Sequence, residues 1–312
     1  SEGPHPQPSL EDDTSIEKRL ERGQPGLIVS ASELMSADLG ELEFAVPGLF
    51  PHGVTLLAGP PKTGKSLLSL NTATAVAKGE DAFGKIPVEQ GNVLYMALED
   101  GPRRMRERLD KMGVSQPPDS LEFTFDWEKF GEGGEKSGSE GLLRNVLASR
   151  QRTGQDYRLI VVDTFARLRE KANANANAYY DDYAAVQDFR DVAHALDAAL
   201  MVVHHTNKLG AGEDPYMRVS GSTGITANVD TVAVLERQRI ENTAELHVSG
   251  RDIEGHKLGM GFNPADLSWT LEGDVATFQM GDTRQEIYDA LKGADEPRGP
   301  SWVSKMPTSS LR

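Results

Sequence analysis

The residues with the clearest chemical potential are those from Gly59 to Ser66, which read Gly-Pro-Pro-Lys-Thr-Gly-Lys-Ser. They fit the phosphate-binding P-loop pattern G-x-x-x-x-G-K-[ST], in which glycines let the backbone curl so that its N–H groups surround phosphate oxygens. Lys65 is placed to reach the outer phosphates, and the Ser66 hydroxyl is placed to hold Mg²⁺. The pattern therefore predicts a site for ATP and Mg²⁺.

The segments on either side of this loop are the ones that a P-loop requires. An apolar, strand-like run at 54–58 precedes it, and an apolar, helix-like run at 67–73 follows it. An ordinary glycine-rich turn would need neither. The predicted nucleotide-binding residues are Gly59, Pro60, Pro61, Lys62, Thr63, Gly64, Lys65, Ser66 and Leu67.

Two further apolar runs end in acidic residues. Residues 159–162 lead into Asp163, which we predict orients the water shell of Mg²⁺ from the end of a buried strand. Residues 92–98 lead into Glu99, whose carboxylate could act as general base on the water that attacks the γ-phosphate. The alternative for Glu99 is a solvated acid at a strand end. Asp100 is predicted to be the N-cap of a helix over 102–112.

The elements that must position these residues alternate between strands and helices. Strands are predicted at 53–58, 92–98, 158–163 and 199–205, most of them continuous apolar runs typical of a parallel sheet covered on both faces. An amphipathic helix between the last two has apolar residues at steps of three and four from Tyr183 to Ala199. Strands at 231–236, 244–249 and 275–279 would extend the sheet through hairpins. The fold class is thus α/β, with a mostly parallel central sheet flanked by helices.

Composition sets limits on function. The 312 residues contain no cysteine, which excludes disulfides and cysteine zinc sites and suits a reducing, cytoplasmic location. No signal peptide or apolar run near 18 residues is evident, so we expect no membrane partner. The net charge of −15 disfavours a uniformly basic nucleic-acid binder. Residues 1–45 hold 10 acidic and 3 basic residues, a net of −7, so a local basic channel elsewhere remains compatible with this charge.

The order of P-loop, strand-end Glu and strand-end Asp resembles the RecA/DnaB group of P-loop ATPases, and more closely the RepA-type hexameric helicases of plasmids, phages and prophages. The resemblance runs from about residue 27 to 280 and implies a RecA-like core. Its motifs are Val46-Pro47-Gly48-Leu49, the P-loop, Tyr95-Met96-Ala97-Leu98-Glu99-Asp100, Val162-Asp163-Thr164, Val202-Val203-His204-His205-Thr206-Asn207-Lys208, Ser220-Gly221-Ser222 and Thr231-Val232-Ala233-Val234-Leu235-Glu236-Arg237.

The resemblance assigns roles to single residues. His205 would be the sensor that hydrogen-bonds near the γ-phosphate, the alternative being a buried structural histidine pair. The loops after Asp163 and His205 would line a channel for single-stranded or forked DNA. Basic residues in those loops are the candidate phosphate contacts, unless they are solvated surface cations. These residues are Arg167, Arg169, Lys171, Lys208 and Arg218.

The same resemblance implies a homo-oligomer, a hexameric ring in which a neighbouring subunit supplies a cation to the γ-phosphate. Arg251 matches the arginine of a Lys-x-Arg pair, while Ser249 replaces the lysine. Arg218 is the second candidate. The alternative is that Arg251 forms a structural ion pair with Asp252 or Glu254.

We therefore predict a mobile acidic tail at 1–26, a RecA-like ATPase core at 27–280 and a short helical segment at 281–312 that resembles a truncated winged helix-turn-helix. The predicted function is that of an ATP-hydrolysing, ring-forming replicative helicase. Two alternatives stay open: a recombination or repair ATPase without processive unwinding, and a slow nucleotide-dependent binding or regulatory module.

Overall fold

The computed structural model describes residues 28–127, 138–154, 156–168, 178–205, 215–219, 223–237 and 241–272. The chain divides into two compact units, Ser1–Leu42 and Glu43–Arg312. The described part of the first unit contains the short helix α2 (Ala31–Ser36), which begins with a capping box: the Ser30 hydroxyl accepts from the Glu33 N–H, and the Glu33 carboxylate accepts from the Ser30 N–H.

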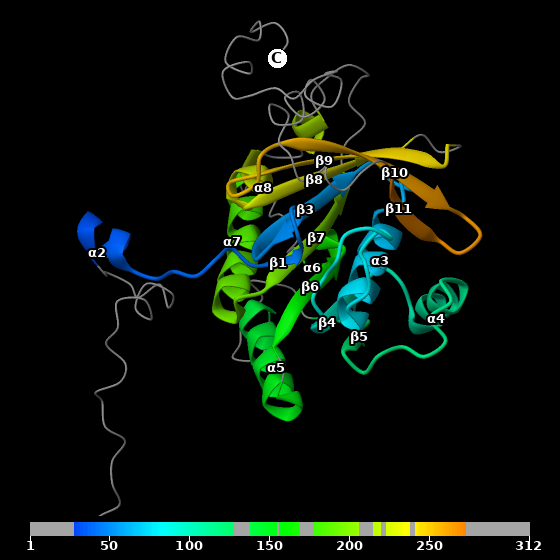
Figure 1. Ribbon diagram of the computed structural model, residues 1–312, viewed down its shortest axis with the longest axis horizontal. Coiled ribbons are helices and arrows are strands. Elements are labelled where there is room, and N and C mark those ends of the chain that lie inside the picture. Colours follow the sequence, from blue (N-terminus) through cyan, green and yellow to red (C-terminus); the bar gives the residue numbers. More distant parts are fainter. Residues whose placement is uncertain are drawn as a thin grey trace, which may run out of the picture. The chain divides into compact units, whose positions relative to one another are not determined.

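A large mixed sheet forms the centre of the second unit (Figure 1). Within the described residues its strand order is β11-β10-β9-β8-β3-β7-β6-β4-β5. The strands from β8 to β5 in this order are parallel to their neighbours, and those from β8 to β11 are antiparallel. Their bounds are β3 (Gly53–Gly59), β4 (Asn92–Ala97), β5 (Leu121–Thr124), β6 (Tyr157–Asp163), β7 (Ala199–His205), β8 (Thr231–Glu236), β9 (Thr243–Gly250), β10 (His256–Asn263) and β11 (Ser268–Glu272). The short strands β1 (Phe44–Val46) and β2 (Phe50–Pro51) pair separately.

Helices cover both faces of this sheet, which is why its central strands are apolar on both sides. The helix α3 (Lys65–Lys78) lies on one face, where its apolar residues share a buried cluster with Leu57 of β3. The helices α5 (Gly138–Thr153) and α7 (Ala178–Leu196) lie on the other, where their apolar residues cluster with Leu56 and Ala58. Successive side chains of a strand point to opposite faces, so β3 contributes to both clusters.

The remaining helical segments connect the strands. They are α4 (Pro102–Lys111), α6 (Phe165–Leu168), the 3₁₀ turn η2 (Pro215–Val219) and α8 (Thr223–Asn228). Among the helices in the described ranges, none combines the length and apolar character needed to cross a membrane.

The structure confirms the α/β class and the predicted strands at 53–58, 92–98, 158–163, 199–205, 231–236 and 244–249, to within one residue at each end. It adds β5, β10 and β11, which were not predicted. In β10 the buried apolar residues Leu258, Met260 and Phe262 follow the period of two, but the intervening glycines, which are depleted in strands, weakened the strand signal.

Two local predictions were wrong. Ala199 is the first residue of β7, and α7 ends at Leu196. Asp100 does not cap α4, whose N-cap is Gly101 without a side-chain hydrogen bond. The Asp100 carboxylate instead forms ion pairs with Arg104 and Arg108 of that helix, because two guanidinium groups compensate a nearly buried charge better than one backbone N–H.

The predicted strand at 275–279 and the helical segment at 281–312 lie outside the described residues. The predicted domain boundaries near residues 26 and 280 also lie there, and they stay predictions.

Candidate nucleotide site

The P-loop follows β3 at the middle of the sheet. The close surroundings of Gly59 and Gly64 explain why these two positions are glycine. A Cβ on Gly59 would lie 2.5 Å from the backbone oxygen of Leu235 at the end of β8. A Cβ on Gly64, which has a φ of +101°, would lie 2.8 Å from the Trp269 ring. Neither position has room for a side chain, so the loop is held between β8 and β11 as it enters α3.

Lys65, the first residue of α3, is buried. Its ammonium donates hydrogen bonds to the backbone oxygens of Gly59, at 2.7 Å, and Pro60, at 2.9 Å. Burial lowers the pKa of Lys65 from 10.5 to about 8, against the opposing effect of the carboxylates of Asp163 and Glu99. An anionic ligand at this loop would favour the charged ammonium, so a phosphate chain suits the site electrostatically.

A buried hydroxyl and carboxylate network lies beside Lys65. The Ser66 hydroxyl donates to Oδ1 of Asp163 at 3.1 Å, and the Tyr95 hydroxyl donates to Oδ2 at 2.9 Å. The hydroxyl of Ser69 lies 2.9 Å from that of Tyr95. Burial raises the pKa of Asp163, and the hydrogen bonds from Ser66 and Tyr95 oppose that shift. A hydroxyl and a carboxylate oxygen side by side are hard oxygen ligands of the kind that Mg²⁺ prefers, so these residues fit the predicted ion.

Glu99 follows β4 and is held by Thr164, the residue that directly follows β6. The Thr164 hydroxyl donates to its Oε1 at 2.8 Å, and Nε2 of His205 lies 4.0 Å from its Oε2. Burial is the main cause that lowers the pKa of His205, and the positive charge of Lys65 adds to it, while Glu99 opposes it. His205 is therefore neutral at neutral pH, and its imidazole can both donate and accept a hydrogen bond.

The order of the strands explains why these residues meet. β3, β7, β6 and β4 are consecutive parallel neighbours, and their carboxyl ends carry the P-loop, His205, Asp163 and Glu99 respectively. Ligand sites in open α/β sheets lie at this edge. Hydrogen bonds join Ser66 to Asp163 and Thr164 to Glu99, and His205 lies 4.0 Å from Glu99, so the side chains at the ends of these strands form one group.

Arg251 lies at the other end of β3. Its guanidinium is 3.9 Å from Oδ1 of Asp230, and the other oxygen of Asp230 accepts from the Val54 N–H at the amino end of β3. The anticipated structural partners were Asp252 and Glu254, whereas the carboxylate that the structure places beside Arg251 is that of Asp230. Within one chain Arg251 is thus on the opposite edge of the sheet from the P-loop.

The predicted DNA contacts are only partly described. Arg167 lies in α6, two residues beyond Phe165, and is exposed. Arg169, Lys171 and Lys208 fall outside the described residues, and Arg218 is described only as part of the backbone of η2.

Two polar residues of the site carried no predicted role. Tyr95 and Thr164 are fully buried and hydrogen-bond to Asp163 and Glu99 respectively. A signal for Tyr95 was present in the sequence, because a tyrosine inside an apolar strand needs a partner for its hydroxyl.

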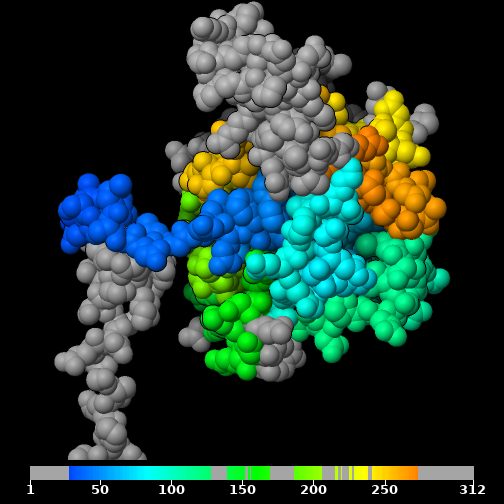
Figure 2. Space-filling view, viewed as in Figure 1, coloured from blue at the N-terminus to red at the C-terminus, as the bar shows by residue number. Residues whose placement is uncertain are grey.

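An arginine and two aromatic rings lie against the P-loop from the antiparallel part of the sheet. The Arg237 guanidinium carbon is 4.3 Å from the Phe262 ring centroid and 5.5 Å from that of Trp269. Its Nη1 is 3.6 Å from where a Cβ on Gly64 would lie. The Asn71 side chain joins α3 to the same region through the Leu267 oxygen and the Trp269 N–H, and Figure 2 shows the two segments adjoining on this face. This cation–π group therefore lies beside the P-loop at Gly64.

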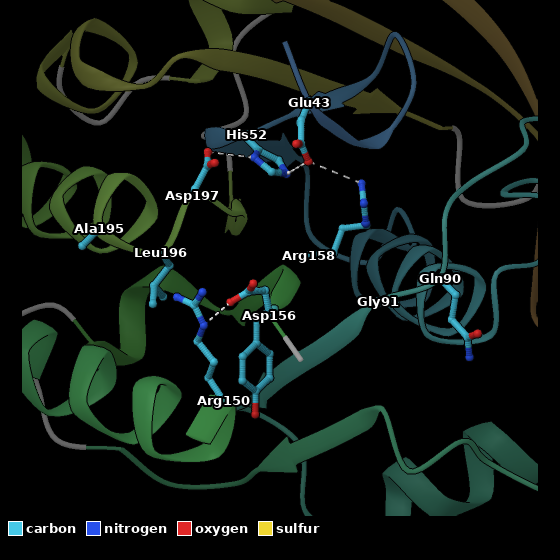
Figure 3. Close-up of a pocket in the computed structure, with 11 residues that line it drawn as sticks. Glu43, His52, Gln90, Gly91, Arg150, Asp156, Arg158, Ala195, Leu196 and Asp197 are labelled. Atoms are coloured by element: carbon cyan, nitrogen blue, oxygen red, sulfur yellow. Dashed lines mark hydrogen bonds and ion pairs between the residues drawn. The ribbon is translucent and has the colours of Figure 1, made fainter. Parts of the chain in front are cut away.

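A cavity of about 580 Å³ lies at the amino-terminal edge of the parallel strands and contains none of the P-loop residues (Figure 3). Its charged side chains pair with one another: Arg150 with Asp156, and His52 with Asp197. Arg158, also in the lining, pairs with Glu89. The cavity is therefore a separate, internally neutralised feature, and the candidate nucleotide site is the opposite edge of the sheet, which carries Lys65 and Asp163.

The fold and the site together define a P-loop ATPase domain with a RecA-like, DnaB-like fold. Residues 16–211 match the family model described as an AAA domain, and the chain belongs to this family. Solved structures with the same fold include one described as the ATPase domain of G40P, at 14% identity and a TM-score of 0.59, covering 83% of this chain and 99% of that one. Another is a DnaB-like replicative helicase studied with its interactions with primase, at 14% identity and a TM-score of 0.57, covering 77% of this chain and 66% of that one.

Proposed function

We propose that this protein is an ATP-dependent DNA motor, a ring-forming replicative helicase that hydrolyses ATP with Mg²⁺ to translocate on single-stranded DNA. The observation that carries the proposal is the contact chain that runs from Thr164, the residue after Asp163, through Glu99 to His205. His205 is the last residue of β7 and directly precedes the segment that contains Lys208, a candidate DNA contact. Loss of the γ-phosphate can thus alter the position of His205 and, through it, the adjoining segment that contains Lys208.

In this proposal each residue of the site has one task. Lys65 leaves the Gly59 and Pro60 oxygens and pairs with the outer phosphates. Ser66 and Asp163 would hold Mg²⁺, directly and through water respectively, and a bound ion would neutralise charge on the phosphate oxygens. Tyr95 fixes the Asp163 carboxylate by its hydrogen bond.

Glu99 takes the proton of the attacking water, or orients that water, while Thr164 holds its other oxygen. The water must approach from the side of Oε2, because Oε1 accepts from Thr164. His205 faces that same oxygen, so it can sense whether the γ-phosphate is present.

Two features support a ring. The fold resembles that of a DnaB-like replicative helicase, and Arg251 lies on the edge of the sheet opposite to its own P-loop. An exposed arginine there can act on a neighbour's nucleotide but not on its own. This arginine is therefore assigned to the γ-phosphate of the next subunit.

The decisive experiment measures ATP hydrolysis by the full chain with and without single-stranded DNA, followed by strand displacement on a forked duplex. We expect DNA to stimulate hydrolysis and ATP to drive displacement. Glu99→Gln should bind ATP but hydrolyse it slower by orders of magnitude, whereas Glu107→Gln, an exposed glutamate of α4, should match the parent.

Each other outcome selects an alternative. DNA-stimulated hydrolysis without displacement on any fork would favour a recombination or repair ATPase. Hydrolysis that ignores DNA would favour a regulatory module with a slow ATPase switch. Size measurements with and without ATP and Mg²⁺ test the ring, and a monomer under both conditions would exclude it.

A further inference from the structure

Three side chains with metal-binding groups lie together where β8 pairs with β9, and none of them has been assigned to ATP or Mg²⁺. In the register of β8 with β9, Glu236 is directly opposite Glu245, and His247 is opposite Val234. Alternate residues of a strand point to the same face, so Glu245 and His247 are neighbours on the face where Glu236 also lies. The pairing of the two strands therefore brings two carboxylates and an imidazole to one place.

Their spacing matches that of ligands around one ion. Nε2 of His247 is 3.3 Å from Oε2 of Glu236 and 3.3 Å from Oε2 of Glu245, and one ligand atom from each residue lies within 4.8 Å of the others. Ligands at about 2.0–2.1 Å from a tetrahedral ion are separated by about 3.3–3.4 Å. The two separations that involve His247 thus already match those around a bound ion, and the third pair of ligand atoms lies within 4.8 Å.

Charge and burial favour a cation at this point. Two glutamates directly opposite each other on paired strands repel, and they need a positive charge between them. Lys257 lies 3.0 Å from Oε1 of Glu245, which leaves Oε2 facing His247. Nε2 of His247 is buried, and neither carboxylate oxygen 3.3 Å away has good hydrogen-bond geometry toward it, so a ligand or a proton at this nitrogen would relieve an unfavourable arrangement.

We infer that Glu236, Glu245 and His247 bind a divalent transition-metal ion of the zinc class, with water completing a four-coordinate site. One imidazole among oxygen ligands favours such ions over Mg²⁺ or Ca²⁺, which take oxygen ligands. The ion would join β8 to β9 beside Arg237, the residue that follows Glu236 and lies against Phe262 and Trp269 at the P-loop. Its role would be to fix the end of β8, whose Leu235 oxygen lies close to Gly59.

The test uses the full chain after treatment with a chelator, titrated with Co²⁺ as a spectroscopic probe and with Zn²⁺ in calorimetry, in both cases without nucleotide and with Mg²⁺ in excess. We expect one equivalent to bind, with the visible absorption of tetrahedral Co²⁺, and a higher unfolding temperature in Zn²⁺. His247→Asn should weaken binding by more than the about 10–100-fold typical of an outer-shell change. Glu236→Gln should weaken it as well.

Two matched controls locate the ion. His256→Asn changes a histidine of β10 that bonds the Glu254 oxygen, and it should leave affinity unchanged. Asp163→Asn removes the predicted Mg²⁺ carboxylate and should also retain Co²⁺ binding. Absence of Co²⁺ and Zn²⁺ binding by the parent, equal binding by folded His247→Asn and Glu236→Gln chains, or loss in Asp163→Asn would overturn the inference.

Discussion

Replacing Lys65 by methionine should stabilise the nucleotide-free protein while abolishing tight ATP binding. The ammonium is buried, and its pKa falls from 10.5 to about 8 because burial disfavours the charged form. The unfolded chain therefore binds this proton more tightly than the folded chain does. Below about pH 8 the protonated lysine opposes folding, and that penalty disappears as pH rises from about 8 to 10.5.

The size of the penalty follows from the shift. One pKa unit corresponds to about 1.36 kcal/mol, so a shift of about 2.5 units (10.5 minus about 8) costs the folded state about 3 kcal/mol at pH 7. Lys65→Met keeps most of the side-chain volume but removes the hydrogen bonds to the Gly59 and Pro60 oxygens. The loss of each bond destabilises the folded variant by about 1 kcal/mol. The expected net gain at pH 7 is on the order of 1–2 kcal/mol.

The assay is urea unfolding of parent and variant at pH 7 and again near pH 10, without nucleotide. The difference in unfolding free energy should favour the variant at pH 7 and shrink or reverse near pH 10, because the parent gains stability as Lys65 deprotonates. Lys62→Met, in the same loop but exposed, is the matched control and should change stability much less. A difference between Lys65→Met and parent that stays constant with pH would refute the reasoning.

Three further predictions concern the neighbouring sites. Tyr95→Phe removes the donor to Oδ2 of Asp163 and should raise the Mg²⁺ concentration needed for nucleotide binding, with a loss of stability of about 1–3 kcal/mol; an unchanged Mg²⁺ requirement would make Tyr95 merely structural. Arg251→Ala should leave nucleotide affinity intact and cut kcat by up to about 10³–10⁵, and mixing it with Glu99→Gln chains should restore part of the activity. No recovery in mixtures shown to co-assemble would contradict a role in trans. Lys171→Ala and Lys208→Ala should each weaken DNA binding and flatten its salt dependence, and equal salt slopes would place the DNA elsewhere.

Local features of the chain were sufficient for the phosphate-binding part of the site. The strand, the glycine-rich loop and the helix that begins at Lys65 are contiguous, so their pattern can be read without knowing what packs around them. Glu99 and Asp163 could be predicted almost as directly. Each follows a buried apolar run, and parallel strands bring their carboxyl ends to one edge.

Residue roles that depend on partners distant in the sequence could not be obtained in this way. Asp100 looked like a helix cap because the rule for caps is local, and it pairs with two arginines because the folded helix places them beside it. Trp269 contacts Gly64 from about two hundred residues away, and no pattern in either segment encodes that contact.

The sequence by itself predicted the residues of a nucleotide site and determined the class of the fold. The tertiary structure alone decided which side chains complete that site and that Glu236 faces Glu245 and His247. The reason is physical. Hydrophobic periodicity specifies which face of a strand is buried, whereas strand order and register arise from the packing of the whole sheet, and a shift by one residue would turn each side chain to the other face.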